Sequence, residues 1–331
     1  MKRKLLIAVA FLATMTAAAQ NIAAVSPNNA TTIYQTLDDA IDGAESGSTI
    51  YLPGGGFQIS DETKINKKLT IMGVSHRGDT DNVDGATIIG GNLYFEEGSS
   101  GSAILGVYVS GNINIGTEEI PVINVIVRYC NINSVQVKNS GCTGTLISNN
   151  YVRSESDFGN SEVTIKNNII NKICNVATGV ISNNVSCHYC WGQARYGNYY
   201  RSLENINNAT IIGNVFRGGD LALMSYFFSG NNCTFFNNLL IGGTIGDAPI
   251  IINASVEDLF EKWNNGSISP ASNFHFKEEY KEYETQVGIY AGDGFSDEKS
   301  LAPIPRIISK KVAESTDESG KLQIVIKVKA Q

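Results

Sequence analysis

The residues best suited to contact a ligand gather between residues 187 and 217. Aromatic rings stack on the faces of sugar rings, and the planar guanidinium of arginine forms two parallel hydrogen bonds with a carboxylate. A stretch rich in both predicts a glycan-binding surface. The alternative is that these rings pack on one another and hold a long segment in place. The predicted ligand-binding residues are Tyr189, Trp191, Arg195, Tyr196, Tyr199, Tyr200, Arg201 and Arg217.

Glycan cleavage would need charged groups in the same region. A polysaccharide lyase needs a cation that neutralises a uronate and a base that removes the α-proton. A glycoside hydrolase needs two carboxylates that face each other across the bond, and the acids nearby are Glu155, Asp157 and Asp220. A solvated loop charge is the competing interpretation for each acid. The catalytic candidates are Arg153, His188, Arg201 and Asp220.

No metal or cofactor is predicted. The sequence Cys187-His188-Tyr189-Cys190 lacks the second pair of ligands that a closed zinc site needs. The acidic run from Asp79 to Asp84, next to His76 and Arg77, could bind Ca²⁺ but lacks the spacing of a calcium loop, so we expect a solvated loop. Four other cysteines lie in or beside apolar strand patterns and are expected to fill the core: Cys130, Cys142, Cys174 and Cys233.

A repeated pattern between Val125 and Leu240 predicts the elements that hold these residues. Residues 163–170 show it best: alternating apolar residues, an Asn pair, then two more apolar residues. Aligned on the second Asn, the repeats fall at positions 130, 150, 168, 184, 214 and 238, with Cys130 replacing Asn in the first. An irregular period near 20 residues with two-residue alternation is typical of a β-solenoid, in which stacked turns build one continuous core.

The Asn pairs have a physical reason to recur at one place in each turn. The chain must turn sharply between two sheets, and Asn tolerates the left-handed backbone conformation that such a turn needs. Stacked Asn side chains can also hydrogen-bond to their copies in neighbouring turns. We therefore expect an Asn ladder along the solenoid.

The start of the chain resembles a known family. Thr36 is a suitable N-cap for an amphipathic helix within Ile33 to Ala44. A Gly-Ser-Thr-Ile-Tyr-Leu-Pro-Gly-Gly segment (47–55) and a Leu-Thr-Ile-Met-Gly strand (69–73) follow. Together they resemble the opening of pectate-lyase-like right-handed parallel β-helix proteins. The resemblance covers roughly residues 33 to 252 and implies an all-β right-handed parallel β-helix with an N-terminal capping helix.

The same resemblance implies where a substrate groove would lie. In the family, the loop that follows the short strand after the Asn turn forms a wall of the groove. Mapped onto this chain, the walls are loops 153–161, 187–208 and 217–232. The family includes lyases, hydrolases, esterases and adhesins, so the fold does not determine an activity. This chain lacks the family's lyase motifs around a catalytic Arg and the paired Asp signature of its pectin hydrolases.

The two ends of the chain predict export and a separate tail. Residues 1–19 read as a signal peptide, with Lys2 to Lys4 before an apolar run and Ala17 to Ala19 at the cleavage site. No later segment reads as transmembrane. Residues 20–252 would form the solenoid and 253–331 a C-terminal cap with a β-hairpin, including a short helix from Val256 to Trp263 that covers the C-terminal end of the rod. Segments 288–290 and 303–306 resemble the tails of secreted β-helix proteins from Bacteroides-type bacteria, which implies a periplasmic, cell-surface or extracellular location.

Composition narrows the function further. The net charge of −7 argues against a nucleic-acid partner but excludes neither a glycan nor a cation. We expect an exported protein that binds a glycan, because no catalytic motif is visible. The alternatives are a polysaccharide lyase or glycoside hydrolase that uses the same groove, and an envelope scaffold or adhesin without a glycan site.

Overall fold

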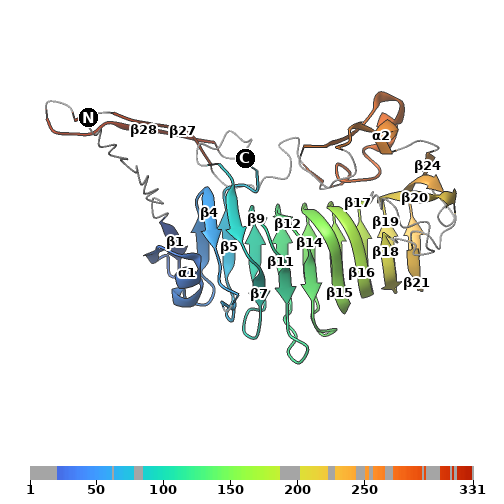
Figure 1. Cartoon of the computed structure of the whole chain (residues 1–331), viewed down its shortest axis with the longest axis horizontal. Helices are drawn as coiled ribbons and strands as arrows, with labels where there is room; N and C mark the ends of the chain where they lie inside the picture. Colours follow the sequence, from blue (N-terminus) through green and yellow to red (C-terminus); the bar gives the residue numbers. More distant parts are fainter. Residues whose placement is uncertain are drawn as a thin grey trace, which may run out of the picture.

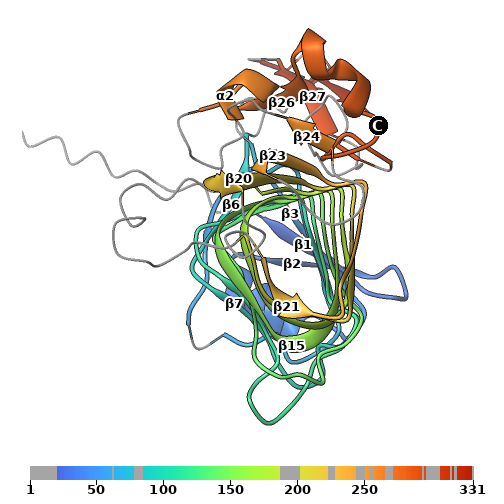
Figure 2. The same ribbon diagram turned by 90° about the vertical axis from the view of Figure 1, so that its right-hand side faces the viewer.

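A computed structural model describes residues 21–331, except 62, 78–84, 187–201, 223–227, 244–249, 253–255, 265–270, 293, 296–305, 314, 317–318 and 330–331. The protein is a parallel β-solenoid in which the chain winds around a three-sided core (Figures 1 and 2). This all-β rod confirms the expected solenoid, and its three faces are named here I, II and III.

Face I holds the longest regular ladder and stacks nine strand segments among the described residues. Apolar residues alternate inward along each segment, as in Ile50, Ile71 and Ile147, because only one side of the strand faces the core. The segments are β3 (Thr49–Leu52), β5 (Thr70–Gly73), β8 (Ala103–Leu105), β11 (Ile126–Arg128), β14 (Thr145–Ser148), the last parts of β15 (Tyr151–Lys166) and β16 (Ile169–Ser182), β19 (Ala209–Ile212) and β22 (Thr234–Phe236).

Faces II and III complete each turn, again with parallel pairing. Face II contains β4 (Gly55–Gln58), β6 (Thr87–Gly90), β9 (Tyr108–Val109), β12 (Asn131–Ile132), the first parts of β15 and β16, β17 (Val185–Ser186), β20 (Val215–Ala222), β23 (Leu239–Gly243) and β24 (Ile250–Ile252). Face III contains β7 (Leu93–Phe95), β10 (Ile113–Ile115), β13 (Val135–Val137), the middle parts of β15 and β16, β18 (Leu203–Asn207) and β21 (Phe228–Asn231).

The Asn pairs occupy the corner between faces I and II and perform two separate tasks. The first Asn of each pair has a positive φ, 58° at Asn149 and 55° at Asn183, and so makes the sharp turn. The second Asn is buried and accepts hydrogen bonds from the Asn of the preceding turn. Asn150, Asn168, Asn184, Asn214 and Asn238 form this continuous Asn ladder, which confirms the predicted one.

A small antiparallel unit covers the N-terminal end of the rod. β1 (Ile22–Val25) pairs with both β2 (Thr31–Tyr34) and β3, and α1 (Leu37–Gly43) lies beside them. Thr36 caps α1 as predicted, because its side chain accepts the Asp39 N–H at 3.1 Å. Ile33, which was placed in the helical segment, lies instead in β2.

The C-terminal module, defined here as the described residues from Val256 to Phe295, packs along the side of the rod. It contains α2 (Val256–Leu259), β25 (Phe260–Lys262), β26 (Asn273–Phe276) and the 3-10 helix η3 (Glu278–Tyr283). Its second apolar core joins module residues to outward-facing residues of face II, among them Ile169, Val215 and Leu239. A helix begins at Val256 as predicted, but it ends at Leu259 and is followed by β25, and the module covers face II (Figure 2).

Docking of this module also uses the Asn turns. The Asn167 side-chain amide donates to the Ile289 and Ala291 carbonyls at 3.2 and 3.0 Å, and the Gly288 N–H donates to the Gly213 carbonyl at 2.7 Å. Beyond the module, β27 (Arg306–Val312) and β28 (Ile324–Lys329) form the predicted antiparallel hairpin.

Candidate functional site

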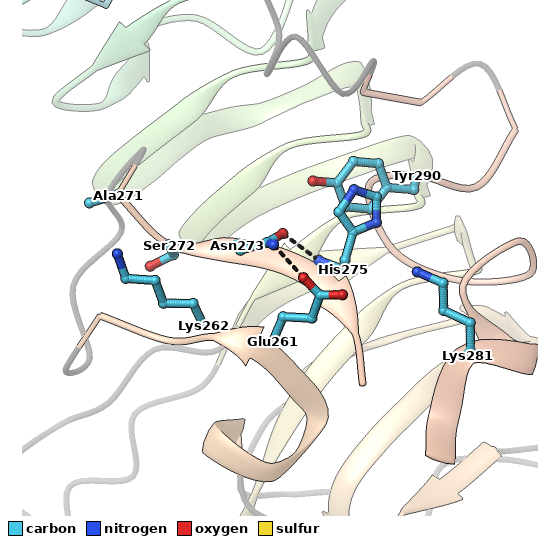
Figure 3. Close-up of a pocket in the computed structure, with 8 residues that line it drawn as sticks. All are labelled: Glu261, Lys262, Ala271, Ser272, Asn273, His275, Lys281 and Tyr290. Carbon is cyan, nitrogen blue, oxygen red and sulfur yellow. Dashed lines mark hydrogen bonds between the residues drawn. The ribbon is translucent and has the colours of Figure 1, made fainter. Parts of the chain in front are cut away.

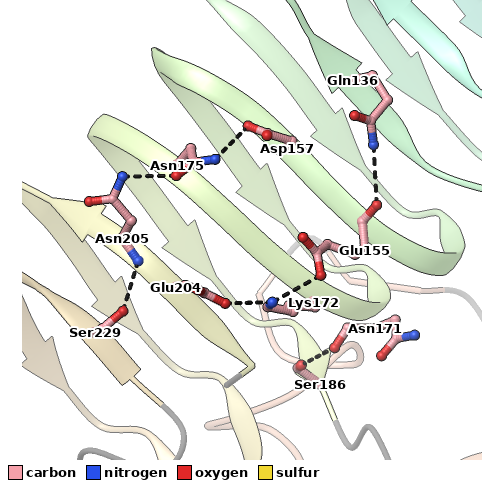
Figure 4. A network of polar contacts seen from close by, with 10 residues as sticks. All are labelled: Gln136, Glu155, Asp157, Asn171, Lys172, Asn175, Ser186, Glu204, Asn205 and Ser229. Carbon is pink, nitrogen blue, oxygen red and sulfur yellow. Dashed lines mark hydrogen bonds and ion pairs between the residues drawn. The ribbon is translucent and has the colours of Figure 1, made fainter. Parts of the chain in front are cut away.

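Face III carries a band of polar side chains on successive turns of the rod. The band lies on β13, β15, β16 and β18 and faces away from the core (Figure 4). We call it the polar strip, and it comprises Gln136, Glu155, Asp157, Lys172, Asn175, Glu204 and Asn205.

Lys172 lies at the centre of the polar strip between two carboxylates. Its Nζ is 2.9 Å from Glu155 Oε2 in the turn before and 2.5 Å from Glu204 Oε2 in the turn after. Only 12% of the Lys172 side chain is exposed. Burial alone would lower the Lys172 pKa, but the hydrogen bonds with Glu204 and Glu155 outweigh it, so the pKa is raised. The ammonium therefore stays charged and joins three turns.

A second chain of polar contacts runs beside this ion triad. The Asn175 amide donates to Asp157 Oδ1 at 2.9 Å, and the Asn205 amide donates to Asn175 Oδ1 at 2.8 Å. Asn175 and Asn205 have φ values of 56° and 54°, so they also make the local turn. Both amides are held in place by their neighbours, which gives the strip a preformed pattern of donors and acceptors (Figure 4).

The segment with the predicted aromatic and basic residues begins and ends next to the polar strip. Ser186 Oγ donates to the Asn171 carbonyl at 3.0 Å, and the Ile173 N–H donates to the Ser202 carbonyl at 2.9 Å. Both ends of 187–201 are thus attached on either side of Lys172. The candidates within it lie outside the described residues: His188, Tyr189, Trp191, Arg195, Tyr196, Tyr199, Tyr200 and Arg201.

The expected loops 153–161 and 217–232 are for the most part strands. Residues 153–161 belong to β15, which pairs with β16 at positions 155–157 and 161 within this range, with register shifts on either side. Residues 217–222 belong to β20 and 228–231 to β21, while 203–207 of the third expected loop form β18. The structure does not describe the side chains of Arg217 and Asp220.

Arg153 is the catalytic candidate whose contacts the structure describes. Its guanidinium donates to Asn131 Oδ1 at 2.6 Å and to the Val109 and Ser110 carbonyls at 3.0 and 3.2 Å. It also lies 4.6 Å from the Tyr108 ring. Burial lowers the Arg153 pKa, an effect that Tyr108 partly opposes. These contacts join three turns of face II.

The early loop also differs from expectation. His76 and Arg77 are buried rather than solvated, with 4% and 7% of their surface exposed. The His76 ring lies 5.5 Å from the Tyr151 ring, which in turn contacts Phe295 of the C-terminal module at 5.8 Å. These two residues therefore belong to the packing along face II. Asp79, Asp81 and Asp84 lie outside the described residues.

A pocket of about 480 Å³ opens in the C-terminal module (Figure 3). Its wall includes the His275 ring, stacked on Tyr290 with centroids 3.9 Å apart. Behind it, Glu284 accepts from Lys281 and His275 at 2.9 and 3.0 Å. Burial alone would raise the Glu284 pKa, but hydrogen bonds from Lys281, the Phe276 N–H and His275 lower it. Trp263 packs on Phe260 and Phe274, and His275 lines this pocket.

The four described cysteines are free thiols. Cys130 and Cys142 fill the core as predicted, whereas Cys174 is buried beside Glu155 of the polar strip. Burial raises the pKa of Cys130 and Cys174 to about 12, with Glu155 contributing at Cys174. Cys233 is only partly buried. Within the described ranges, no cluster of three or more His, Cys, Asp or Glu could hold a metal ion. Cys187 and Cys190 lie outside them.

The fold and the polar strip together define an all-β parallel solenoid with an ordered polar face. The chain matches no family model, no curated protein and no solved structure. Among the residues that the structure describes, no helix has the length and apolar character needed to span a bilayer.

Proposed function

We propose that this protein is an exported, pectate-lyase-like right-handed β-helix that binds a glycan along the polar strip and the adjoining segment 187–201. The observation that carries the proposal is the order of the strip. Carboxylate and amide side chains lie on consecutive turns, about 4.8 Å apart along the rod, and one ammonium lies among them. Such groups hydrogen-bond sugar hydroxyls, and the neighbouring aromatic residues would supply faces for stacking.

The charge of the strip favours a neutral or cationic glycan over a polyuronate. It contains three carboxylates, from Glu155, Asp157 and Glu204, against the single ammonium of Lys172. A uronate polymer laid along it would meet like charges, which are repulsive at close range. Arg195 and Arg201 in the adjoining segment remain the groups suited to an isolated carboxylate.

The same geometry favours binding over cleavage at this face. Glu155 and Glu204 each form an ion pair with the Lys172 ammonium, so both carboxylates are already engaged before a substrate arrives. A hydrolase needs one carboxylic acid that carries a proton to the leaving group. The Arg153 guanidinium, with three hydrogen bonds to the rod, is already engaged before a substrate arrives. The lyase or hydrolase alternative therefore rests on the other candidates, His188, Arg201 and Asp220, whose side chains the structure does not describe.

A glycan panel tests this proposal by measuring both retention and newly formed reducing or unsaturated ends. We expect retention of a neutral or cationic glycan without product. Lys172→Met and Asn175→Gly should weaken retention about tenfold each, since each removes a positioned polar group, and glycine keeps the positive φ of Asn175. Trp191→Ala and Arg201→Ala test the adjoining segment.

The matched control is Thr210→Ala, an exposed residue on face I that is remote from the strip in the winding of the chain. Retention that falls equally in Thr210→Ala would contradict the proposed site. Product formation that is lost in Trp191→Ala or Arg201→Ala would make the protein an enzyme. No retention of any glycan would leave the scaffold alternative.

A further inference from the structure

The terminal ribbon, defined as residues 306–329 with β27 and β28, exposes an apolar face. Val312, Ile324, Ile326 and Val328 share one side of the ribbon in its register and are 47–58% exposed. None of them belongs to either apolar core of the described protein. An isolated two-stranded ribbon is marginally stable in water. The terminal ribbon therefore needs a partner surface.

The charge of the ribbon indicates an acidic partner. It carries six Lys and Arg against three Asp and Glu, whereas the rest of the chain carries 19 against 29. On the side opposite the apolar face, Lys311 and Lys327 flank the exposed Val325. A second ribbon would repel this one, but a surface of the acidic rod would attract it.

The N-terminal cap of the rod offers such a surface. β2 is the outermost strand of this end and pairs only with β1 among the described strands. Its Ile33 is 52% exposed, and the neighbouring helix α1 and its end present the exposed acids Asp39, Asp42 and Glu45.

The direction of the ribbon favours the cap of a second copy. The ribbon extends past α1 and beyond the N-terminal end of its own rod (Figure 1). It would therefore meet the cap of a copy that approaches with the same end. Such an approach lets each copy give its ribbon and receive the other's, which is the two-fold exchange of an isologous dimer.

We propose that this protein forms a two-fold dimer in which the β28 edge of each terminal ribbon adds to the β2 edge of the other copy. Backbone hydrogen bonds of the added strand supply affinity, as in other cases of strand addition. The apolar face of the ribbon covers Ile33, and Lys311 and Lys327 lie against the acids of the cap.

Charge reversal tests this arrangement, with mass measured by light scattering during gel filtration. The purified protein should have twice the mass of one chain. A ribbon-reversed variant, Lys311→Glu with Lys327→Glu, and a cap-reversed variant, Asp42→Lys with Glu45→Lys, should each raise the dimer dissociation constant at least about a hundredfold. Ile33→Lys should act in the same direction.

Mixing the two reversed variants provides the decisive measurement. In a mixed pair, each ribbon meets a cap of opposite charge, so equal amounts should restore the dimer. The control Lys138→Glu with Lys262→Glu makes the same charge change at exposed positions away from the cap and the ribbon and should remain dimeric. A wild-type monomer, a mixture that stays monomeric, or assemblies larger than a dimer would each overturn the proposal. The first two results are those expected if each ribbon binds the cap of its own copy. Such binding is the competing arrangement, because residues 296–305, which precede the ribbon, can span up to about 36 Å.

Discussion

The side-chain amide of Asn168 donates to Asn184 Oδ1 at 2.9 Å, and the Asn168 backbone N–H donates to the same oxygen at 2.9 Å. One acceptor thus satisfies two donors of the preceding turn. The Asn184 amide in turn donates to the Ile165 carbonyl and to Asn214 Oδ1. Each buried Asn therefore satisfies backbone groups that the corner leaves without a strand partner.

Removal of one Asn from the buried ladder should destabilise the rod strongly. Asn184→Ala leaves the Asn168 donors and the Ile165 carbonyl buried without that partner, so we expect a loss of about 3 kcal/mol in the free energy of unfolding. Chemical denaturation measures it. The control is Asn231→Ala. The Asn231 side chain is exposed and donates to Asn207 Oδ1 outside the buried ladder, so its loss should change the free energy of unfolding by less than about 0.5 kcal/mol. Equal effects at the two positions would contradict the role of the buried ladder.

Docking of the C-terminal module should depend on Asn167 but not on Asn149. Both residues have positive φ, so glycine preserves the turn at either position. Asn167→Gly also deletes two hydrogen bonds to the Ile289 and Ala291 carbonyls and should weaken docking by about 1–2 kcal/mol. Hydrogen exchange of residues 286–291 measures this. Asn149→Gly is the matched control, and faster exchange in that variant as well would show that the turn, not the contact, matters.

Lys172 should make the stability of the rod sensitive to alkaline pH. Its pKa is raised in the folded state, so its contribution is fully present below the ordinary lysine value of about 10.4 and declines as the pH rises through the raised value. Lys172→Met should lower stability at pH 8 by about 1 kcal/mol, since both carboxylates are partly exposed. Denaturation curves from pH 8 to above 10.4 should show the two proteins converging. A constant difference would contradict the linkage.

The buried thiols should be unreactive in the folded protein. A thiol with a pKa near 12 is about 0.01% thiolate at pH 8, and the thiolate is the reactive form. Alkylation followed by peptide mass spectrometry should leave Cys130 and Cys174 unmodified in native conditions and label both after unfolding. Cys233, which is partly buried, should react sooner than either. Rapid native labelling of Cys174 would contradict its placement beside Glu155.

The winding of the rod could be predicted from sequence, because the alternation of apolar residues indicates the strands and the Asn pairs indicate the turns between them. The pairing of Glu155 with Lys172 could not. Tyr151 and Val152 pair with residues 18 positions later, but a register shift after Val152 reduces the offset to 17 at Glu155. The uniform offset would place Glu155 opposite the core residue Ile173. A one-residue irregularity of this kind leaves no mark in the apolar pattern.

The position of the C-terminal module did have a sequence signal. Two consecutive apolar residues follow most of the Asn pairs, as in Ile169-Ile170 and Leu239-Leu240. In a strand, neighbouring side chains point to opposite sides, so such a pair indicates a strand that is covered on both. One residue of each pair belongs to the core of the rod and the other to the core beneath the module. The same signal could have directed the module to face II.

The Asn ladder also makes the rod tolerant of changes in length. The steps from Asn168 to Asn184 and from Asn184 to Asn214 are 16 and 30 residues long, yet both end in the same pair of hydrogen bonds. The described winding stops at Ser186 and resumes at Ser202. Doubling the length of an intervening segment adds only about 0.6 kcal/mol in loop-closure entropy. The segment between these two serines can therefore change in length and sequence during evolution, while the scaffold on either side of it is inherited unaltered.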